Sequence, residues 1–269
     1  MKGGVDLVFA VVNQKGGVGK TTTSVNLAAC MGADGLRALV VDLDPQGNAT
    51  SGFGVDKSTL DQCVYDLLVN EVPVGELIRT AVCENVDLVP ATLNLAGAEV
   101  ELVAAMSREW RLRRGLSPVR EQYDMVLIDS PPSLSLLTLN ALAAADHALV
   151  PIQCEYYALE GISQLLKTLT LVKQHLNREL SVGGVVLTMH DPRVRLTQQV
   201  AEEVRRYFGH QALDTVIPRN VRLSEAPSHG VPVNIYDPRS RGADAYRSLA
   251  REMAERFALR PSGGAKRAA

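Results

Sequence analysis

A glycine-rich segment placed directly after a short apolar run sets the strongest limit on the fold of this chain. Residues 16–21 read GGVGKT, and they follow the apolar run at 7–13 and open the helical pattern at 20–32. A strand, a glycine-rich turn and a helix in this order form a phosphate-binding loop, because glycines let successive backbone N–H groups turn toward a phosphate. The positive end of the helix dipole also favours an anion there. The segment therefore predicts a nucleotide-binding α/β domain.

The loop departs from the usual spacing of such sites, G-x-x-x-x-G-K-[ST]. Position 14, where the first glycine is expected, holds Gln14, and a second cation, Lys15, precedes the glycines. Lys20 is expected on the β- and γ-phosphates, and the Thr21 hydroxyl on Mg²⁺. The residues alone leave two interpretations of Lys15 open, a functional cation or a solvated lysine of the loop.

Strand-like and helix-like segments alternate along the rest of the chain. Hydrophobic residues make up 46% of the sequence but aromatics only 4%, so the core must be built from Val, Leu, Ile and Ala. This pattern predicts an α/β fold with a doubly wound, mostly parallel sheet and helices on both faces. We expect a single domain over 1–260 and a disordered tail over 261–269. The expected strands are 7–13, 38–44, 86–90, 125–130, 147–152, 182–188 and 214–218, and the expected helices are 20–32, 94–114, 133–145, 158–176, 196–208 and 242–258.

Aspartates follow two of the expected strands. "MVLIDSPP" places Asp129 at the end of an apolar run that two prolines stop, and "ALVVDLDPQGN" ends in Asp42 and Asp44. Ligands bind at the carboxyl ends of strands in such sheets, and Mg²⁺ prefers carboxylate oxygens. Asp129 is therefore expected to support the metal, and one of the other two could orient the attacking water. A plain surface turn stays open for Asp44.

Five motifs in order, KGGVGKTTT, DLDPQGN, IDSPPS, EYYALEG and IPRNVRLSEAPSHG, give the chain a resemblance to a known family. Over roughly residues 7–258 it resembles the ParA/Soj family of chromosome and plasmid partition ATPases. That family shares a deviant phosphate-loop fold with MinD and the nitrogenase iron protein. The resemblance implies a Mg²⁺-dependent ATPase with ATP as its nucleotide, and slow hydrolysis that a ParB-type (Spo0J-type) partition protein stimulates.

The same resemblance assigns roles to individual positions. It implies that Lys15 reaches the ATP of a second subunit, so that a homodimer sandwiches two nucleotides. It gives the catalytic roles to Lys15, Lys20 and Asp44, with Asp44 positioning the water. It places Asp42 near Thr21 and the metal. The implied Mg²⁺ set is Thr21, Asp42 and Asp129. The implied ATP contacts are Lys15, Gly16, Gly17, Val18, Gly19, Lys20, Thr21, Thr22, Pro218 and Asn220.

Basic residues are concentrated near the C-terminus, although the net charge of the whole chain is −2. Residues 191–269 carry 14 Lys and Arg against 9 Asp and Glu, which can mark a contact face for an anion. The resemblance implies that non-specific double-stranded DNA is bound there, mainly through Arg193, Arg195, Arg219 and Arg222. Arginine suits phosphate contacts, which position a protein without reading sequence. Helix caps and surface ion pairs are the alternative role for these side chains.

Other classes of protein fit the sequence less well. A MinD-like membrane-cycling ATPase needs a lipid-facing C-terminal helix, but the apolar stripe of 242–258 is explained more simply by packing on the core. An iron–sulfur protein needs paired cysteines, whereas Cys30, Cys63, Cys83 and Cys154 are widely spaced. A scaffold that binds nucleotide without turning it over is a third alternative. No signal peptide or membrane span is recognised, so we expect a cytoplasmic, nucleoid-associated protein with no membrane partner.

Overall fold

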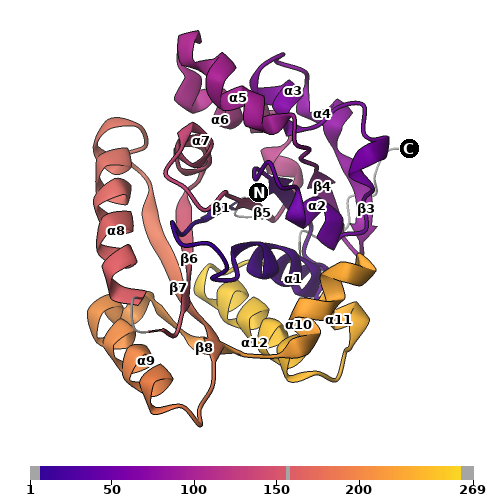
Figure 1. Cartoon of the computed structure of the whole chain (residues 1–269). Coiled ribbons are helices and arrows are strands. Elements are labelled where there is room, and N and C mark those ends of the chain that lie inside the picture. Colours follow the sequence, from indigo (N-terminus) through magenta and orange to yellow (C-terminus); the bar gives the residue numbers. More distant parts are fainter. Residues whose placement is uncertain (1–6, 156–157, 262–269) are drawn as a thin grey trace.

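One eight-stranded sheet organises the chain (Figure 1). A computed structural model describes residues 7–155 and 158–261. The strands lie in the order β3-β4-β2-β5-β1-β6-β7-β8, and every neighbouring pair is parallel except β3 and β4. The predicted mostly parallel sheet is confirmed. The strands are β1 (Leu7–Val11), β2 (Ala38–Asp42), β3 (Arg79–Cys83), β4 (Val86–Val89), β5 (Met125–Asp129), β6 (His147–Gln153), β7 (Ser181–His190) and β8 (Ala212–Pro218).

Helices cover both faces of this sheet, and the alternation of side chains along the central strand shows why. Val8 and Ala10 of β1 face one apolar core, while Phe9 and Val11 face the other. Both sets are fully buried, so the strand reads as a continuous apolar run. The α-helices are α1 (Lys20–Ala33), α2 (Asn48–Gly52), α3 (Val64–Leu68), α4 (Val74–Leu77), α5 (Leu95–Glu101), α6 (Arg111–Leu116), α7 (Leu136–Ala144), α8 (Ala158–His175), α9 (Arg195–Phe208), α10 (Val221–Glu225), α11 (Val233–Tyr236) and α12 (Arg241–Arg256).

The two cores differ in the helices that close them. The core behind Phe9 is covered by α1 and α12, which lie side by side in Figure 1. The core behind Val8 is covered by α7, α8 and α9 together with the short helices between β2 and β5. The predicted double winding is confirmed. The carboxyl ends of β1, β2 and β5 are thereby gathered at one edge of the sheet, next to the start of α1.

The prediction of a single helix over 94–114 is wrong. The segment divides into α5, two 3-10 turns, η2 (Leu102–Ala104) and η3 (Arg108–Trp110), and α6. The break lies at Ser107, whose φ of 53° is left-handed, so the helical hydrogen-bond ladder cannot continue through it. The side chains of Val100, Val103 and Met106 are 62–87% exposed, so their helical spacing reflects no packing surface.

Several short elements between β2 and β5 were not predicted from the sequence. These include α2, α3, α4 and the edge strand β3, whose first three residues are exposed. Ala81 has a φ of 55° and donates its backbone N–H to Asp87 Oδ1 at 2.7 Å. The bulge at this point disturbs the ladder with β4. A strand without alternating burial leaves no period-2 pattern to read.

The C-terminal helix packs on the core, as its apolar stripe predicts. Leu249 and Met253 of α12 are fully buried, and Ala245 and Phe257 are partly buried against the same core. Within the described part of the chain no helix is long and apolar enough to cross a membrane. The predicted tail and the tyrosine pair at 156–157 lie outside the described residues, apart from the first tail residue, Pro261.

Candidate nucleotide site and basic edge

The phosphate loop joins β1 to α1 at the carboxyl edge of the sheet. Gly17 and Gly19 have φ angles of 73° and 90°, a left-handed region that a side chain would strain, so both positions require glycine. The Thr188 hydroxyl of β7 donates to the carbonyl of Val18 at 2.8 Å. The loop is therefore held against the sheet.

Lys20 is drawn into this loop. The residue is only 6% exposed, and its amino group donates to the Lys15 carbonyl at 3.2 Å. Burial lowers the pKa of Lys20, while the negative charges of Asp129 and Asp44 oppose that shift. A desolvated ammonium group that curls back over a glycine-rich loop is suited to bind phosphate oxygens.

Thr21 and Asp129 are already in contact. The Thr21 hydroxyl donates to Asp129 Oδ2 at 2.7 Å, and the Ser24 hydroxyl donates to Asp129 Oδ1 at 3.0 Å. Asp129 is fully buried, and burial together with the charge of Asp42 raises its pKa to about 7. The sequence placed Asp42 near Thr21 and grouped both with Asp129 as a metal set; in the structure the Thr21 hydroxyl contacts Asp129, and Ser24, which was not predicted, contacts it as well.

Asp42 ends the neighbouring strand and is equally buried. Its Oδ2 accepts from the Thr50 backbone N–H at 2.8 Å and from the Thr50 hydroxyl at 2.7 Å. Burial raises the pKa of Asp42 to about 6, although the bonds from Thr50 lower it. Buried carboxyls next to a threonine hydroxyl fit a hard divalent cation, because Mg²⁺ takes oxygen ligands and restores the balance of charge.

Asp44 is buried close enough to Lys20 to act on its charge, and is not exposed as a residue of a plain surface turn would be. It is only 8% exposed, and its Oδ1 caps the following loop by accepting from the Gln46 N–H at 3.0 Å. The same loop is fixed from outside by Lys57, whose amino group donates to the Gln46 carbonyl at 2.7 Å. Gly47, with φ 61°, leaves room for this contact, since an added Cβ would approach the Lys57 side chain to 2.6 Å. Asp44 is therefore held rigidly near Lys20.

Lys15 behaves differently from Lys20. Its side chain is 44% exposed, and its amino group forms an ion pair with Glu155 Oε2 at 2.8 Å. Its backbone N–H donates to Asn13 Oδ1 at 3.0 Å, and Asn13 in turn donates to the Pro151 carbonyl at 2.7 Å. The backbone at Lys15 is thus anchored, while the ammonium group remains at the surface of its own subunit.

Pro218 and Asn220, the residues expected to contact the base, lie beside Gly19 of the phosphate loop. Together with Gly19, Thr22 and Tyr246 they line a cavity of about 150 Å³. The Asn220 side chain accepts from the Arg222 backbone N–H at 2.8 Å and so begins α10. The cavity is a candidate for the base of a nucleotide whose phosphates lie in the loop.

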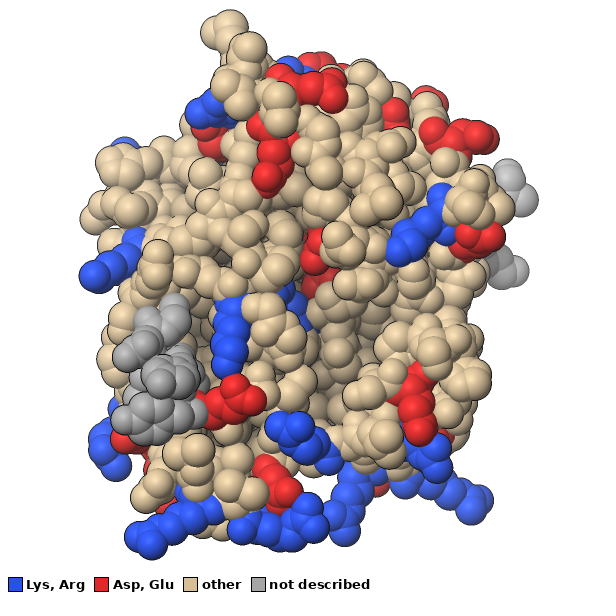
Figure 2. Space-filling model, in the orientation of Figure 1, with Lys and Arg blue, Asp and Glu red and all other residues tan. Residues whose placement is uncertain are grey.

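The four arginines predicted to contact DNA are exposed but not equivalent. Arg193 pairs with Asp191 at 2.7 Å, and Arg222 pairs with Glu225 at 2.7 Å and with Asp237 at 3.2 Å. Arg195 and Arg219 form no ion pair within residues 7–155 and 158–261. Figure 2 shows Lys and Arg side chains gathered along the lower edge of the face, beyond the ends of α9 and α10 in Figure 1.

Other metal centres find no support in the described ranges. Cys30, Cys63 and Cys154 are buried free thiols, and Cys83 is partly buried. Among residues 7–155 and 158–261, no group of three or more His, Cys, Asp and Glu could hold a metal ion. Mg²⁺ does not need such a cage, because it is usually bound by one or two carboxylates together with nucleotide phosphates and water.

Several residues of the site were assigned no role from the sequence, although Glu155 opens the EYYALEG motif. Thr50, Thr188, Lys57 and Glu155 each hold a predicted residue or its loop, and they come from α2, β7, η1 (Lys57–Thr59) and the end of β6. Thr188 and Glu155 lie 170 and 140 residues from their partners. The closeness of Thr188 and Glu155 to the loop could have been inferred only from the way strand ends lie together in a parallel sheet.

Comparison with known proteins agrees with this geometry. An AAA domain family model matches residues 7–182. The chain is 60% identical to the sporulation initiation inhibitor protein Soj of Bacillus subtilis, covering 92% of this chain and 98% of Soj. It is 52% identical to the chromosome partitioning protein ParA of Myxococcus xanthus, covering 94% and 89% of the two chains.

The fold also matches a solved structure from Mycobacterium smegmatis. That protein is named cobyrinic acid a,c-diamide synthase and was solved with an ATP analogue and magnesium. It is 36% identical, has a TM-score of 0.83, and covers 97% of this chain and 98% of its own. Partition proteins are the more similar relatives in sequence. The chain has a deviant phosphate loop and aspartates at two strand ends, and its relatives at 52–60% identity include Soj and ParA. It therefore belongs to the ParA/Soj family of chromosome-partitioning ATPases.

Proposed function

We propose that this protein is an ATP-driven switch that binds DNA non-specifically as a dimer and partitions chromosome or plasmid origins. The observation that carries this proposal is the contrast between its two loop lysines. Lys20 is buried in the phosphate loop, whereas Lys15 remains 44% exposed at the surface of the same loop. An exposed cation beside a nucleotide site is placed to act on the nucleotide of a second subunit.

The chemistry follows from the contacts of the loop. Lys20 binds the β- and γ-phosphates, and Thr21, Asp129 and Asp42 provide oxygens for the metal or for its bound water. When bound, Mg²⁺ offsets the charge that builds up on the phosphates. Asp44 accepts a hydrogen bond from the attacking water and orients it in line with the γ-phosphate. Gly16, Gly17, Val18, Gly19 and Thr22 contribute backbone contacts, and Pro218 and Asn220 contact the base.

Lys15 couples hydrolysis to assembly. A cation against the transferred phosphoryl group stabilises the charge spread over its oxygens, as an arginine finger does. When that cation comes from the other protomer, each nucleotide is complete only in the dimer. Lys15 must then leave Glu155, so ATP-dependent dimerisation exchanges an ion pair within one subunit for a contact between subunits.

DNA binding is assigned to the exposed arginines Arg193, Arg195, Arg219 and Arg222, which together form the basic edge. Arg195 and Arg219 offer guanidinium groups that have no carboxylate partner among the described residues, while Arg193 and Arg222 must exchange a carboxylate partner for a phosphate. Contacts to about six phosphates would make log K fall with log salt at a slope near −5. Such contacts carry no sequence information, so the dimer would coat the nucleoid without an operator.

The named relatives support the biological setting. Soj and ParA are partition proteins by name, and a ParB-type protein is the partner that would stimulate hydrolysis and release the dimer from DNA. The whole of 1–260 is proposed to act as one ATPase domain in the cytoplasm, in contact with the nucleoid. The lower identity to the diamide synthase gives that activity less support.

Binding to an unrelated linear duplex tests the proposal most directly. The duplex is titrated with parent, Lys15→Gln and Lys173→Gln chains, each with ATP, ADP and no nucleotide. Lys173 is an exposed lysine of α8 and serves as a charge-matched control. We expect binding with ATP only, loss in Lys15→Gln and no change in Lys173→Gln. Binding that ignores nucleotide, or a Lys15→Gln chain that binds normally, would refute the coupling through Lys15.

A further inference from the structure

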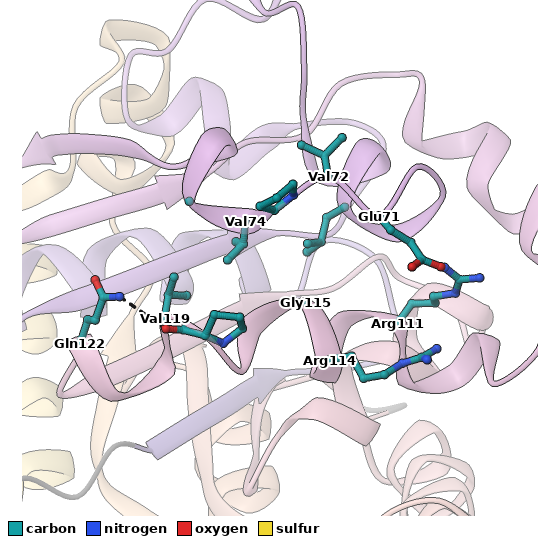
Figure 3. A pocket seen from close by; sticks show the side chains of 12 residues that line it. Glu71, Val72, Val74, Arg111, Arg114, Gly115, Val119 and Gln122 are labelled. Atoms are coloured by element: carbon teal, nitrogen blue, oxygen red, sulfur yellow. Dashed lines mark hydrogen bonds and ion pairs between the residues drawn. The ribbon is translucent and has the colours of Figure 1, made fainter.

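A groove separate from the nucleotide site lies between the α3–α4 turn and α6 (Figure 3). Its volume is about 570 Å³, in the range of pockets that bind ligands. Its floor is apolar, formed by Leu67, Val72, Val74 and Val119. None of its lining residues belongs to the phosphate loop or to the basic edge. The groove therefore has a chemistry that the partition cycle described above does not use.

One end of the groove carries a buried arginine. The Arg111 side chain is only 16% exposed, and its Nη1 group forms an ion pair with the carboxylate of Glu71. The Nε atom of Arg111 is buried and has no hydrogen-bond partner among the described residues. A buried N–H donor without an acceptor is costly to leave unsatisfied. Among the described residues only the Nη1 group of Arg111 has a partner, so this end of the groove has capacity for a further acceptor.

Glu71 shows which kind of group suits this end. Its side chain is 69% exposed, and its backbone has a φ of 56°, a left-handed conformation that non-glycine residues rarely adopt. The carboxylate of Glu71 thus reaches Arg111 at the mouth of the groove, and the backbone of Glu71 is strained. The fork of an arginine accommodates carboxylates particularly well.

A second arginine stands next to the first. Arg114 lines the same groove and is exposed. Its guanidinium donates to the Ser107 carbonyl at 3.4 Å, a long bond, and it forms no ion pair with any described carboxylate. Figure 3 shows Arg111 and Arg114 together at one end of the groove, with Gln122 at the opposite end. The groove is thus cationic at one end and apolar along its floor.

We propose that this groove binds a short acidic segment of a partner protein. A carboxylate of the segment pairs with Arg114 and Arg111, and the apolar side chains beside it lie on the floor between Leu67 and Val119. Charge complementarity selects an acidic partner, and the elongated, open form of the groove suits a peptide. The bond to Arg111 is formed either alongside Glu71 or in its place.

Fluorescence polarisation on the full chain tests this site. The probe is a labelled, capped peptide of sequence GSEELVLG, compared with its neutral counterpart GSQQLVLG. We expect the acidic peptide to bind at least tenfold more tightly than the neutral one. Arg114→Glu should weaken binding of the acidic peptide at least tenfold. Arg113→Glu should leave it unchanged, because Arg113 lines the adjacent hollow beside Trp110 and not this groove.

Two further variants separate a docking site from a general charge effect. An added Cβ at Gly75 meets nothing within 4 Å, so Gly75→Leu should fill the groove and abolish binding without disturbing the fold. Glu71→Asn should strengthen binding severalfold, since asparagine tolerates left-handed backbone and frees Arg111. Equal binding of the two peptides, no binding of either up to millimolar concentration, or undiminished binding by Gly75→Leu would each overturn the proposal.

Discussion

Asp42 and Asp129 occupy paired positions on the adjacent parallel strands β2 and β5, and both carboxyls are fully buried. Each is also hydrogen-bonded by a threonine hydroxyl, Thr50 for Asp42 and Thr21 for Asp129. Burial disfavours the charged form of both carboxyls, and the charge of Asp42 adds to this at Asp129, so both pKa values are raised. The parallel register therefore places two buried carboxyls together, and a bound cation would offset their negative charge.

The first prediction concerns pH. The pKa values of Asp42 and Asp129 are raised from 3.8 to about 6 and about 7. Between pH 4 and 7 the folded chain keeps protons that the unfolded chain has released, so its free energy of unfolding falls as pH rises. We expect urea denaturation of the nucleotide-free chain to show this decline, with a flatter profile in Asp129→Asn. Asp214→Asn, at an exposed site, is the control and should keep the parent slope.

The same pair makes magnesium binding depend on pH. Mg²⁺ competes with the retained protons, so its affinity in the presence of ADP should rise as pH increases from 6 to 8. Titration calorimetry in buffers of different ionisation enthalpy measures the protons released. A magnesium affinity that is constant over this range would show that the buried pair does not contact the metal or its water.

The second prediction concerns Asp44. Asp44→Ala should lower the rate of ATP hydrolysis at least a hundredfold, because a positioned general base contributes about 10²–10⁴-fold. ATP affinity should change little, since Lys20 and the loop hold the phosphates, and the ATP-bound dimer should persist. Asp214→Ala, which removes an exposed carboxylate of β8, is the control. Turnover at the parent rate would rule out a water-positioning role for Asp44.

The third prediction concerns Lys57, which fixes the loop after Asp44. Lys57→Met keeps the apolar stem and removes only the bond to the Gln46 carbonyl. We expect kcat to fall severalfold while KM changes less than twofold, because the loop positions the water and not the nucleotide. Lys57→Arg should restore much of the rate. A parallel rise in KM would instead show that the loop contributes to nucleotide binding.

The sequence predicted those parts of the site in which local order determines position. The positions of Asp129 and Asp42 were predicted because each ends an apolar strand, and that of Thr21 because it follows the loop lysine at the start of a helix. No role was predicted for Lys57 or Glu155, because Lys57 reaches the Gln46 carbonyl across a turn 11 residues along the chain and Glu155 reaches Lys15 from 140 residues away. The helix expected over 94–114 failed at Ser107, where a left-handed residue interrupts a stretch of ordinary helical spacing.

The fourth prediction concerns the basic edge. Arg222→Glu should weaken binding to DNA at least tenfold and reduce the magnitude of the salt slope by about one for each phosphate that is no longer neutralised. ATP-dependent dimerisation should remain, because Arg222 is exposed and its ion pairs contribute little to stability. Arg178→Glu reverses an exposed charge near the opposite end of the sheet, just before β7, and should bind DNA normally. Equally weakened binding in both variants would indicate a general charge effect.

The fifth prediction concerns the ion pair between Lys15 and Glu155. Glu155→Gln removes the carboxylate that holds the Lys15 ammonium group at 2.8 Å. The pair is nearly half exposed, and such pairs contribute about 0.2–1 kcal/mol. Each dimer breaks two such pairs, about 0.4–2 kcal/mol together, so the substitution should strengthen ATP-dependent dimerisation by a factor of about 2–30, as measured by sedimentation with a non-hydrolysable ATP analogue.

The control for this pair is Glu179→Gln, which removes an exposed charge between α8 and β7 and should leave the dimer unchanged. The double variant Lys15→Gln, Glu155→Gln should dimerise no better than Lys15→Gln alone, because Glu155 acts only through that lysine. If Glu155→Gln instead weakens the dimer, the carboxylate contacts the second subunit itself. Glu155 would then hold the assembled dimer together and would not restrain Lys15 in the monomer.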